Sequence, residues 1–468
     1  MKITPAVFEA YLKCPTKCWL RATGEAANGN TYAEWVQAQN ASYRETGTAR
    51  LVAASPQDEV ALSPDMENVK AATWRLASSL AVQAETDSCT LASELHAVER
   101  VPAGGRGKAA QFIPIRFVIT NKLGKDDKLL LALDAVALSK ALKREVSLGK
   151  IIHGDNHATL KVKTSALAGE VRKHLEKIAA LLASPTPPDL VLNRHCGECE
   201  FQARCRKIAV EKDDLSLLAN MSAKERQKLR SKGIFTVTQL SYTFRPRRRP
   251  KKLRDKREKY HHSLKALAIR EKKIHIVGSQ ELKIEGTPVY LDVEGLPDRD
   301  FYYLIGLRIG SGESAVQHSL WADTVADEGK IWREFLAILE TVEKPVLIHY
   351  GSYETTFSKQ MAERHGNPQA ESVAAKAIAC ALNLVSVMFA KIYFPTFSNR
   401  LKEIGGWLGF TWNETEASGL NAILWRYIWE TSKDNSPRER LIGYNAEDCG
   451  VLEIVAKALS RNGDEQPK

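Results

Sequence analysis

No apolar run in the 468-residue sequence is long enough to cross a membrane, and Lys2 is not followed by the apolar core of a secretion signal. The sequence therefore predicts no membrane partner and a cytoplasmic location. It also has no glycine-rich Walker A loop, so ATP-driven unwinding would have to come from a helicase or another nucleic-acid-processing partner. The length exceeds that of one typical core and predicts two to four domains.

Charge of one sign is in excess: 67 Lys and Arg residues against 56 Asp and Glu residues give a formal net charge of +11. This excess favours a polyanionic partner such as nucleic acid, although many basic proteins bind no anion. DNA is the expected polymer rather than RNA, although no sequence feature tells the two apart.

Eight cysteines in a chain without a secretion signal argue against a disulfide framework, so their spacing is informative. Cys196, Cys199 and Cys205 form a Cys-x-x-Cys-x5-Cys cluster in HCGECEFQARC, and Cys14 or Cys18 in YLKCPTKCWL could supply a fourth thiolate. Four thiolates suit zinc or an iron–sulfur cluster. The alternative is that these cysteines pack as small hydrophobic residues.

This cysteine pattern resembles the RecB-like nucleases that carry an iron–sulfur cluster, a family that includes the CRISPR adaptation exonuclease. YLKCPTKCWL is similar to the opening of that family. The resemblance implies a restriction-endonuclease-like α/β domain over residues 1–210. It also implies a [4Fe–4S] cluster, joining the two ends of the domain, with the ligands Cys14, Cys196, Cys199 and Cys205.

The same family binds metal through an aspartate and a Glu-x-Lys pair on adjacent strands. Asp134, at the end of a strand expected in KLLLALDAVAL, matches the aspartate and is the possible N-terminal metal ligand. In REVSLGKIIHG, Glu145 and Lys150 are too far apart to form the pair. The N-terminal domain is therefore expected to be catalytically weak or inactive and to bind nucleic acid. Further candidates on the preceding strand are Glu94, His96 and Glu99.

The middle of the chain predicts a helical hairpin over residues 211–243 and a basic linker over residues 244–285. Ser222 opens one helix, Gly233 ends it, and Thr236 or Thr238 begins the next. The hairpin resembles a helix–hairpin–helix that contacts phosphates, and a plain αα-hairpin is the alternative. The linker could be merely solvated, but we interpret it as an arm that follows a phosphate backbone through Arg245, Arg247, Arg248, Arg249, Lys251 and Lys252.

Residues 286–462 alternate between strands and helices, which predicts an RNase H-like α/β domain. In PVYLDVEGL, Asp292 and Glu294 lie on one face of a strand. Two unpaired carboxylates on a buried strand are costly, and two divalent ions about 4 Å apart would remove that cost. Glu354 opens a helix after a buried strand, and Tyr444 and Asp448 in YNAEDC lie one helical turn apart.

This order of residues resembles the DnaQ-like 3′–5′ exonucleases of the DEDD group that carry a tyrosine. The resemblance implies that Asp292, Glu294 and Asp448 bind Mg²⁺ or Mn²⁺, that Glu354 assists through metal or water, and that Tyr444 orients the attacking water. The segment NRLKEIGGWLGFTW is also similar to one between the second and third motifs of relatives of that group. The middle motif departs from the family, because His349-x-x-x-Tyr353-Glu354 replaces Asn-x-x-x-Phe-Asp.

Both halves together resemble bacterial RecB-family nucleases with a fused ribonuclease H-like domain. The resulting prediction is an α/β multidomain, metal-dependent nuclease. It would act as a 3′–5′ exonuclease on single-stranded ends, through two metal ions in the C-terminal domain. The alternative is a non-catalytic nucleic-acid-binding adaptor in which both nuclease folds have degraded.

Overall fold

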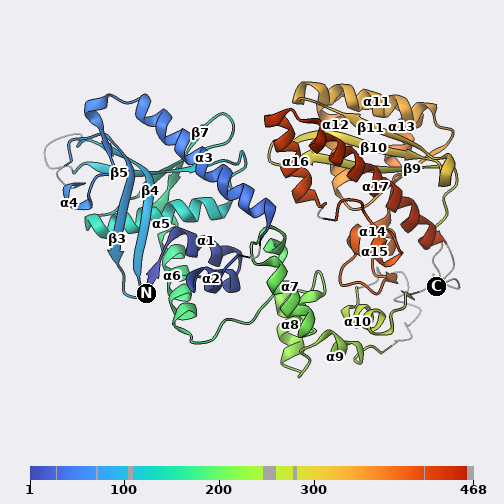
Figure 1. Ribbon diagram of the computed structural model, residues 1–468, viewed down its shortest axis with the longest axis horizontal. Helices are drawn as coiled ribbons and strands as arrows, with labels where there is room; N and C mark the ends of the chain where they lie inside the picture. The colour runs from blue at the N-terminus through green and yellow to red at the C-terminus, as the bar shows by residue number, and fades with distance from the viewer. Residues whose placement is uncertain are drawn as a thin grey trace. The chain divides into compact units, whose positions relative to one another are not determined.

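The computed structural model describes residues 1–27, 29–69, 72–103, 109–245, 260–277, 282–415 and 417–460. The chain divides into two compact units, Met1–Cys205 and Arg206–Lys468, each containing both helices and sheet (Figure 1). The predicted mixed α/β, multidomain class is confirmed. The linker residues Arg247, Arg248, Arg249, Lys251 and Lys252 lie outside the described residues. Among the described helices, none is long and apolar enough to cross a membrane.

The first unit is built on one mixed sheet with the strand order β2-β3-β4-β5-β6-β7, and β1 pairs with β4. Its strands are β1 (Lys2–Ile3), β2 (Val60–Leu62), β3 (Leu76–Glu85), β4 (Thr90–Val101), β5 (Gln111–Val118), β6 (Leu148–His153) and β7 (Ala158–Lys163). Its main helices are α1 (Pro5–Lys13), α2 (Pro15–Ala22), α3 (Thr31–Ala53), α5 (Lys125–Leu142) and α6 (Ala168–Ala183), with the single turn α4 (Met66–Val69).

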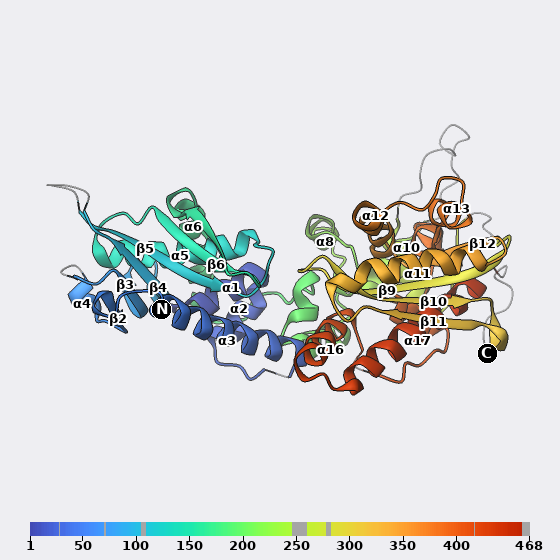
Figure 2. The ribbon, with the colours of Figure 1, turned by 90° about the horizontal axis from the view of Figure 1, so that it is seen from above.

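Two hydrophobic clusters cover the two faces of this sheet. One joins strands β3 and β4 to α5 and α6, and the other joins the opposite face to α3 through Tyr43, Leu51 and Val52. Figure 2 shows the strands between these helices. Asn30 caps α3 by accepting a hydrogen bond from the Ala33 amide at 3.0 Å, and Thr4 caps α1 by accepting one from the Val7 amide at 3.3 Å.

The prediction of a strand in KLLLALDAVAL is wrong, because these residues form helix α5. The Asp127 carboxylate accepts the Gly124 amide at 2.7 Å and so caps the helix start. Ten α5 residues are buried, since the sheet covers one side and α6 and the first helices cover the other. A continuous apolar run is compatible with either a buried strand or a buried helix, so the sequence pattern alone could not distinguish the two.

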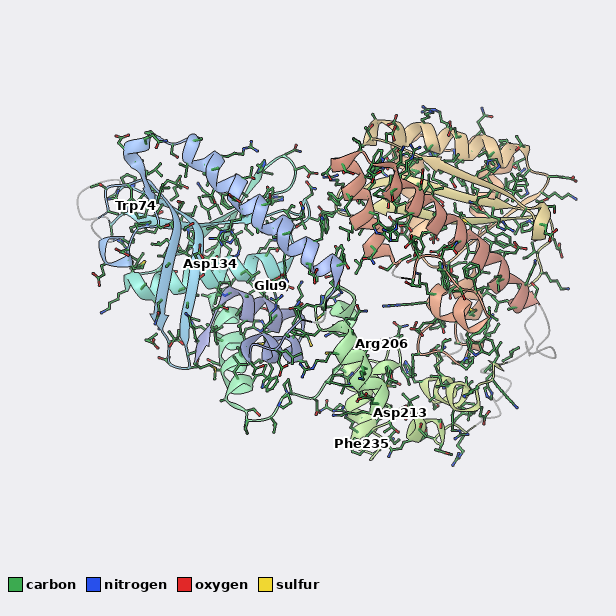
Figure 3. All side chains as sticks on the ribbon, in the orientation of Figure 1. Glu9, Trp74, Asp134, Arg206, Asp213 and Phe235 are labelled. Atoms are coloured by element: carbon green, nitrogen blue, oxygen red, sulfur yellow. The ribbon has the colours of Figure 1, made fainter. Side chains whose placement is uncertain are left out.

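The second unit begins with short helices and continues into an α/β sandwich. The helices are α8 (Ala223–Arg230), α9 (Val237–Ser241) and α10 (His262–Glu271), preceded by α7 (Gln202–Glu211), which crosses the unit boundary. Ser222 caps α8 and Thr236 caps α9, with Gly233 at φ +77° between them, so these two short helices form a hairpin. Phe235, at the tip of this hairpin, is 52% exposed (Figure 3).

The C-terminal sheet has the order β11-β10-β9-β12-β13, antiparallel among the first three strands and parallel in the rest. Its strands are β9 (Thr287–Leu296), β10 (Phe301–Ile309), β11 (Val316–Trp321), β12 (Pro345–His349) and β13 (Leu382–Asn383). Helices α11 (Glu328–Thr341), α12 (Tyr353–His365) and α13 (Val373–Ala379) lie on one side, and α16 (Gly419–Ser432) and α17 (Asn435–Ser460) lie on the other (Figures 1 and 2).

Four shorter helices and strands complete the second unit, and one of them is helix α14 (Leu384–Met388). Strands β8 (His275–Ile276) and β14 (Ile392–Tyr393) pair with each other, and helix α15 (Leu401–Trp407) packs on α17. Lys265 of α10 is 1% exposed and donates to the Phe394 carbonyl, the Thr396 hydroxyl and the Asn399 side chain at 2.9, 3.1 and 2.9 Å. Helix α10 is thereby fixed to the loop that leads into α15.

A buried arginine fastens α16 to the edge of the C-terminal sheet. Arg426 is fully buried, and its guanidinium lies 4.5–5.1 Å from the ring centroids of Phe301, Tyr303, Trp321 and Trp429. It donates to the carbonyls of Ala322 and Asp323 at 2.9 and 2.6 Å and to Glu430 at 2.9 Å. The Arg426 guanidinium therefore contacts four aromatic rings and donates hydrogen bonds to three acceptors.

Replacing Arg426 with methionine is expected to lower the free energy of unfolding by about 3 kcal/mol, because two carbonyls and one carboxylate lose a buried partner. Urea unfolding followed by tryptophan fluorescence measures the change. The matched control is Arg438→Met, since Arg438 contacts Trp321 alone among these rings, at 5.1 Å, and should cost no more than about 1 kcal/mol. Equal effects for the two variants would contradict the role given to Arg426.

Candidate nuclease site

Four acids from three elements meet at the centre of the C-terminal sheet. Asp292 and Glu294 lie on β9, opposite Gly306 and Leu304 of β10, and both are partly accessible. Glu354 lies in the first turn of α12, the helix that follows β12, and Asp448 lies within α17; both are about 95% buried. The structure therefore brings together the acids that the sequence predicted as one set.

Electrostatics shows that these acids face one another. The pKa of Asp292 is raised well above its usual range by burial first and then by the charges of Asp448, Glu294 and Glu354. Burial, Asp448 and Glu354 likewise raise the pKa of Glu294. Burial raises the pKa of Asp448 to about 6, although hydrogen bonds from Trp412 and Tyr444 oppose the shift. An additional positive charge placed among these groups would lower their pKa values and stabilise the protein.

Three side chains fix the orientation of two of the acids. The Asn445 amide nitrogen donates to the Asp292 carboxylate at 2.6 Å and to its carbonyl at 3.1 Å. The Trp412 indole nitrogen donates to Asp448 at 2.7 Å. The Tyr444 hydroxyl is also hydrogen-bonded to Asp448, and burial together with the neighbouring acids raises its pKa, so it stays a neutral donor.

A glycine on the neighbouring strand leaves room for this arrangement. Gly306 of β10 is paired with Asp292, and a Cβ added there would lie 1.9 Å from the Asn445 side-chain oxygen. Any other residue would therefore displace the asparagine that holds Asp292. The Asn445 side-chain oxygen itself is buried and has no hydrogen-bond partner.

The middle motif contains two more buried polar atoms that have no hydrogen-bond partner. His349 Nδ1 and Glu354 Oε2 lie 3.4 Å apart, beyond good hydrogen-bond geometry, and both atoms are buried without a partner. Tyr353 precedes Glu354, and its hydroxyl lies where a Cβ on Gly295 would come within 2.6 Å. The His-x-x-x-Tyr-Glu motif therefore also faces the acids of β9.

A lysine for which the sequence predicted no role also lies near these acids. Lys402, in the first turn of α15, lies 5.0 Å from the ring centroid of Tyr444 and 5.2 Å from that of Trp412. Its ammonium donates to the Ala417 carbonyl. Burial lowers its pKa, although the charges of Asp448, Glu447 and Glu294 oppose this shift.

The donor chemistry of the four acids fits divalent cations. Carboxylate oxygens are the ligands that Mg²⁺ and Mn²⁺ prefer, and the unpartnered oxygen of Glu354 and the mutual repulsion of the acids are both costs that a cation would remove. As the side chains stand, no group of three His, Cys, Asp or Glu residues among the described residues is arranged to hold a metal ion. Binding would therefore require side-chain rotation.

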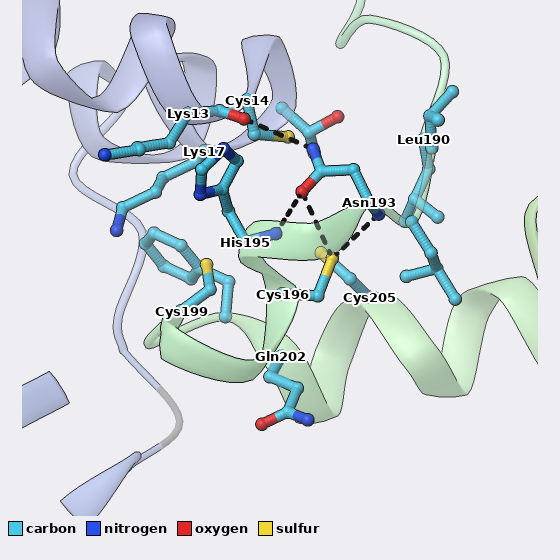
Figure 4. A pocket seen from close by; sticks show the side chains of 14 residues that line it. Lys13, Cys14, Lys17, Leu190, Asn193, His195, Cys196, Cys199, Gln202 and Cys205 are labelled. Atoms are coloured by element: carbon cyan, nitrogen blue, oxygen red, sulfur yellow. Dashed lines mark hydrogen bonds between the residues drawn. The ribbon is translucent and has the colours of Figure 1, made fainter. Parts of the chain in front are cut away.

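The predicted cysteine ligands lie around one pocket of the first unit. Cys14, Cys196, Cys199 and Cys205 all line it (Figure 4). Cys14 lies between α1 and α2, whereas Cys18 is fully buried within α2 and does not line the pocket. Burial, with the charges of the other three cysteines, raises the pKa of Cys205 to about 11. The Asn193 amide donates to the Cys196 sulfur at 3.2 Å, the kind of bond that stabilises a thiolate ligand.

The N-terminal acids do not form a comparable cluster. Asp134 is in the middle of α5 rather than at a strand end, is 1% exposed, accepts from Ser93 at 2.7 Å and lies 3.5 Å from the Arg116 guanidinium (Figure 3). Glu99 and Lys150 form an ion pair with each other, and Glu94 pairs with Arg44. Both oxygens of Asp134 are thus occupied by protein groups.

Sequence reasoning missed Asn445, Trp412 and Lys402. All three lie in the segments YNAEDC and NRLKEIGGWLGFTW, but their roles depend on contacts between distant elements. Spacing gives one partial signal, because Asn445 and Asp448 are three residues apart and so share a helix face.

Comparison with known proteins agrees with the C-terminal architecture. The family model of the RNase H superfamily matches residues 289–460, which contain all four acids, Tyr444 and Lys402. The prediction of an RNase H-like C-terminal part is thereby confirmed. No curated protein matches the chain.

Proposed function

We propose that the C-terminal domain, residues 286–462, is a metal-dependent nuclease that removes nucleotides from the 3′ ends of single-stranded nucleic acid, with DNA as the first polymer to test. The observation that carries the proposal is the meeting of Asp292, Glu294, Glu354 and Asp448 within a region that matches the RNase H superfamily. The charges of the neighbouring acids raise the pKa values of Asp292 and Glu294, and such crowding of carboxylates is poorly suited to a purely structural role.

Each residue has a defined part in the proposed reaction. Two bound Mg²⁺ or Mn²⁺ ions would supply Lewis acidity and lower the pKa of the attacking water. Asp292, Glu294 and Asp448 would hold them, and Glu354 would assist through metal or water. Asn445 and Trp412 keep Asp292 and Asp448 in place. Tyr444, a neutral phenol hydrogen-bonded to Asp448, would orient the attacking water.

Single strands with a label at the 5′ end test this function directly. In the presence of Mn²⁺ the purified protein should shorten them progressively from the 3′ end. The alternative function, a nucleic-acid-binding adaptor without catalysis, draws support from the absence of a preformed metal-ligating group among the described side chains. Tight binding of the oligonucleotide with no shortening would favour that alternative.

The first unit is proposed as a restriction-endonuclease-like domain that binds rather than cuts nucleic acid. Its sheet and helices provide the α/β framework, while Asp134, Glu94 and Glu99 are each engaged by basic or hydroxyl side chains. Residues 211–243 and the basic segment 244–285 are proposed to add phosphate contacts. Among the predicted binding residues of that segment, the structure describes Arg245. Its side chain is exposed and donates hydrogen bonds to the carbonyls of Tyr242 and Phe244.

A [4Fe–4S] cluster held by Cys14, Cys196, Cys199 and Cys205 is proposed for the pocket of the first unit. Anaerobically purified protein should contain about four irons per chain, and Cys14→Ser should lose most of them because a thiolate ligand is removed. Metal analysis and visible absorption measure the loss. Cys18→Ser is the matched control, since Cys18 lies in the next helical turn but outside the pocket. Stoichiometric zinc without iron would contradict the cluster.

A further inference from the structure

Lys402 places a positive charge beside the cluster of acids. Its ammonium is attracted to Asp448, Glu447 and Glu294, and it lies over the rings of Tyr444 and Trp412. These two aromatic residues are the ones hydrogen-bonded to Asp448. The lysine is therefore beside the groups that would orient the attacking water.

The hydrogen-bonding capacity of this ammonium is only partly used. A lysine ammonium has three N–H donors, and the hydrogen bond found for Lys402 goes to the Ala417 carbonyl. Over the described ranges, no carboxylate forms an ion pair with it at 4.0 Å or less, in contrast to Lys457, whose ammonium is paired with Glu453. Lys402 thus keeps donors and an unneutralised charge directed at the site.

Helix α15 holds this lysine in a fixed position. A Cβ added to Gly405 would lie 2.6 Å from Val451 of α17 and 2.9 Å from the Trp412 ring, so the two helices approach closely at this glycine. The loop before α15 is tied down by the three hydrogen bonds of buried Lys265. A cation fixed before substrate arrives requires little reorganisation when charge develops.

We propose that Lys402 binds the scissile phosphodiester, donating to a non-bridging oxygen and stabilising the negative charge that grows there during cleavage. The inference rests on the proposed nuclease function and adds a substrate-binding residue to it. The carboxylates alone would repel a phosphate, and bound metal ions would neutralise that repulsion. The fixed ammonium of Lys402 would then add to the attraction between the site and the phosphate. The purely structural alternative is that Lys402 only holds the Ala417 carbonyl.

Lys402→Met, Lys402→Arg and the matched control Lys359→Met test the proposal. Lys359 lies on α12 with its side chain 77% exposed, so its loss removes the same charge away from the acids. With Mn²⁺ and a 5′-labelled single strand, Lys402→Met should lower kcat/KM about 10²-fold, the usual effect of losing one charge-stabilising donor. Lys402→Arg should keep most of the activity, and Lys359→Met should match the unmodified protein.

Binding in Ca²⁺, measured by fluorescence anisotropy of the same oligonucleotide, separates this inference from the nuclease function. Lys402→Met should bind the oligonucleotide more weakly than Lys359→Met. If this difference is found but no variant cleaves, the nuclease proposal fails and the phosphate contact stands. Equal affinities for these two variants would overturn the contact. A Lys402→Arg variant as impaired as Lys402→Met, with a lowered unfolding temperature in both, would also overturn it in favour of the structural role.

Discussion

Replacing Asp292 with asparagine is expected to reduce metal-dependent cleavage by at least about 10³-fold, because a metal ligand worth about 4 kcal/mol of transition-state stabilisation is lost. Asparagine has nearly the same shape, and its side-chain oxygen can still accept the Asn445 amide at the position that now accepts it at 2.6 Å. The loss would therefore report charge rather than packing. The rate of shortening of 5′-labelled single strands in Mn²⁺ measures it, and Asp448→Asn should have a similar effect.

Two further variants give this experiment its controls. Tyr444→Phe should slow cleavage about 10-fold to 100-fold and leave Mn²⁺ affinity unchanged, since only a water-orienting hydroxyl is removed. Asp134→Asn should leave cleavage nearly intact, because Asp134 is bonded to Ser93 and lies beside Arg116 within the first unit. Loss of cleavage in Asp134→Asn with full activity in Asp292→Asn would place the chemistry in the first unit instead.

The C-terminal acids could be predicted because their positions follow local rules. Alternation along β9 places Asp292 and Glu294 on one face, and helical spacing places Tyr444 and Asp448 on one side of α17. Glu354 follows a buried strand, so its place at the edge of the sheet also follows from chain order. These inferences need only the period of one element or the order of neighbouring elements along the chain.

The remaining residues of the candidate site depend on contacts that no local period contains. Trp412 reaches Asp448 across 36 positions, and Asn445 reaches Asp292 across 153. The misassigned α5 has a related cause, because its apolar residues are covered on two sides and leave no amphipathic pattern. The mistaken placement of Asp134 at a strand end followed from that error.

Stability of the metal-free protein is expected to fall as the pH rises from about 5 to 7.5. The pKa of Asp448 is raised to about 6 and those of Asp292 and Glu294 are also raised, so the native state holds protons that the unfolded state releases. Groups with raised native pKa values contribute stability at low pH and lose it as the pH passes the native pKa. Asp448 alone gives about 1 kcal/mol over this range, or about 2 to 4 °C in unfolding temperature.

Divalent metal should reverse this dependence, because Mn²⁺ binds the deprotonated acids and only the folded chain brings them together. Differential scanning fluorimetry should therefore show a larger Mn²⁺-induced rise in unfolding temperature at pH 7.5 than at pH 5. Asp448→Asn should flatten the metal-free pH profile. Glu453→Gln on the same helix should not, since Arg308 and Lys457 lower the pKa of Glu453 and its contribution has the opposite sign. A metal-free profile that rises with pH in the unmodified protein but not in Glu453→Gln would show that structural ion pairs, rather than Asp292, Glu294 and Asp448, dominate the pH dependence.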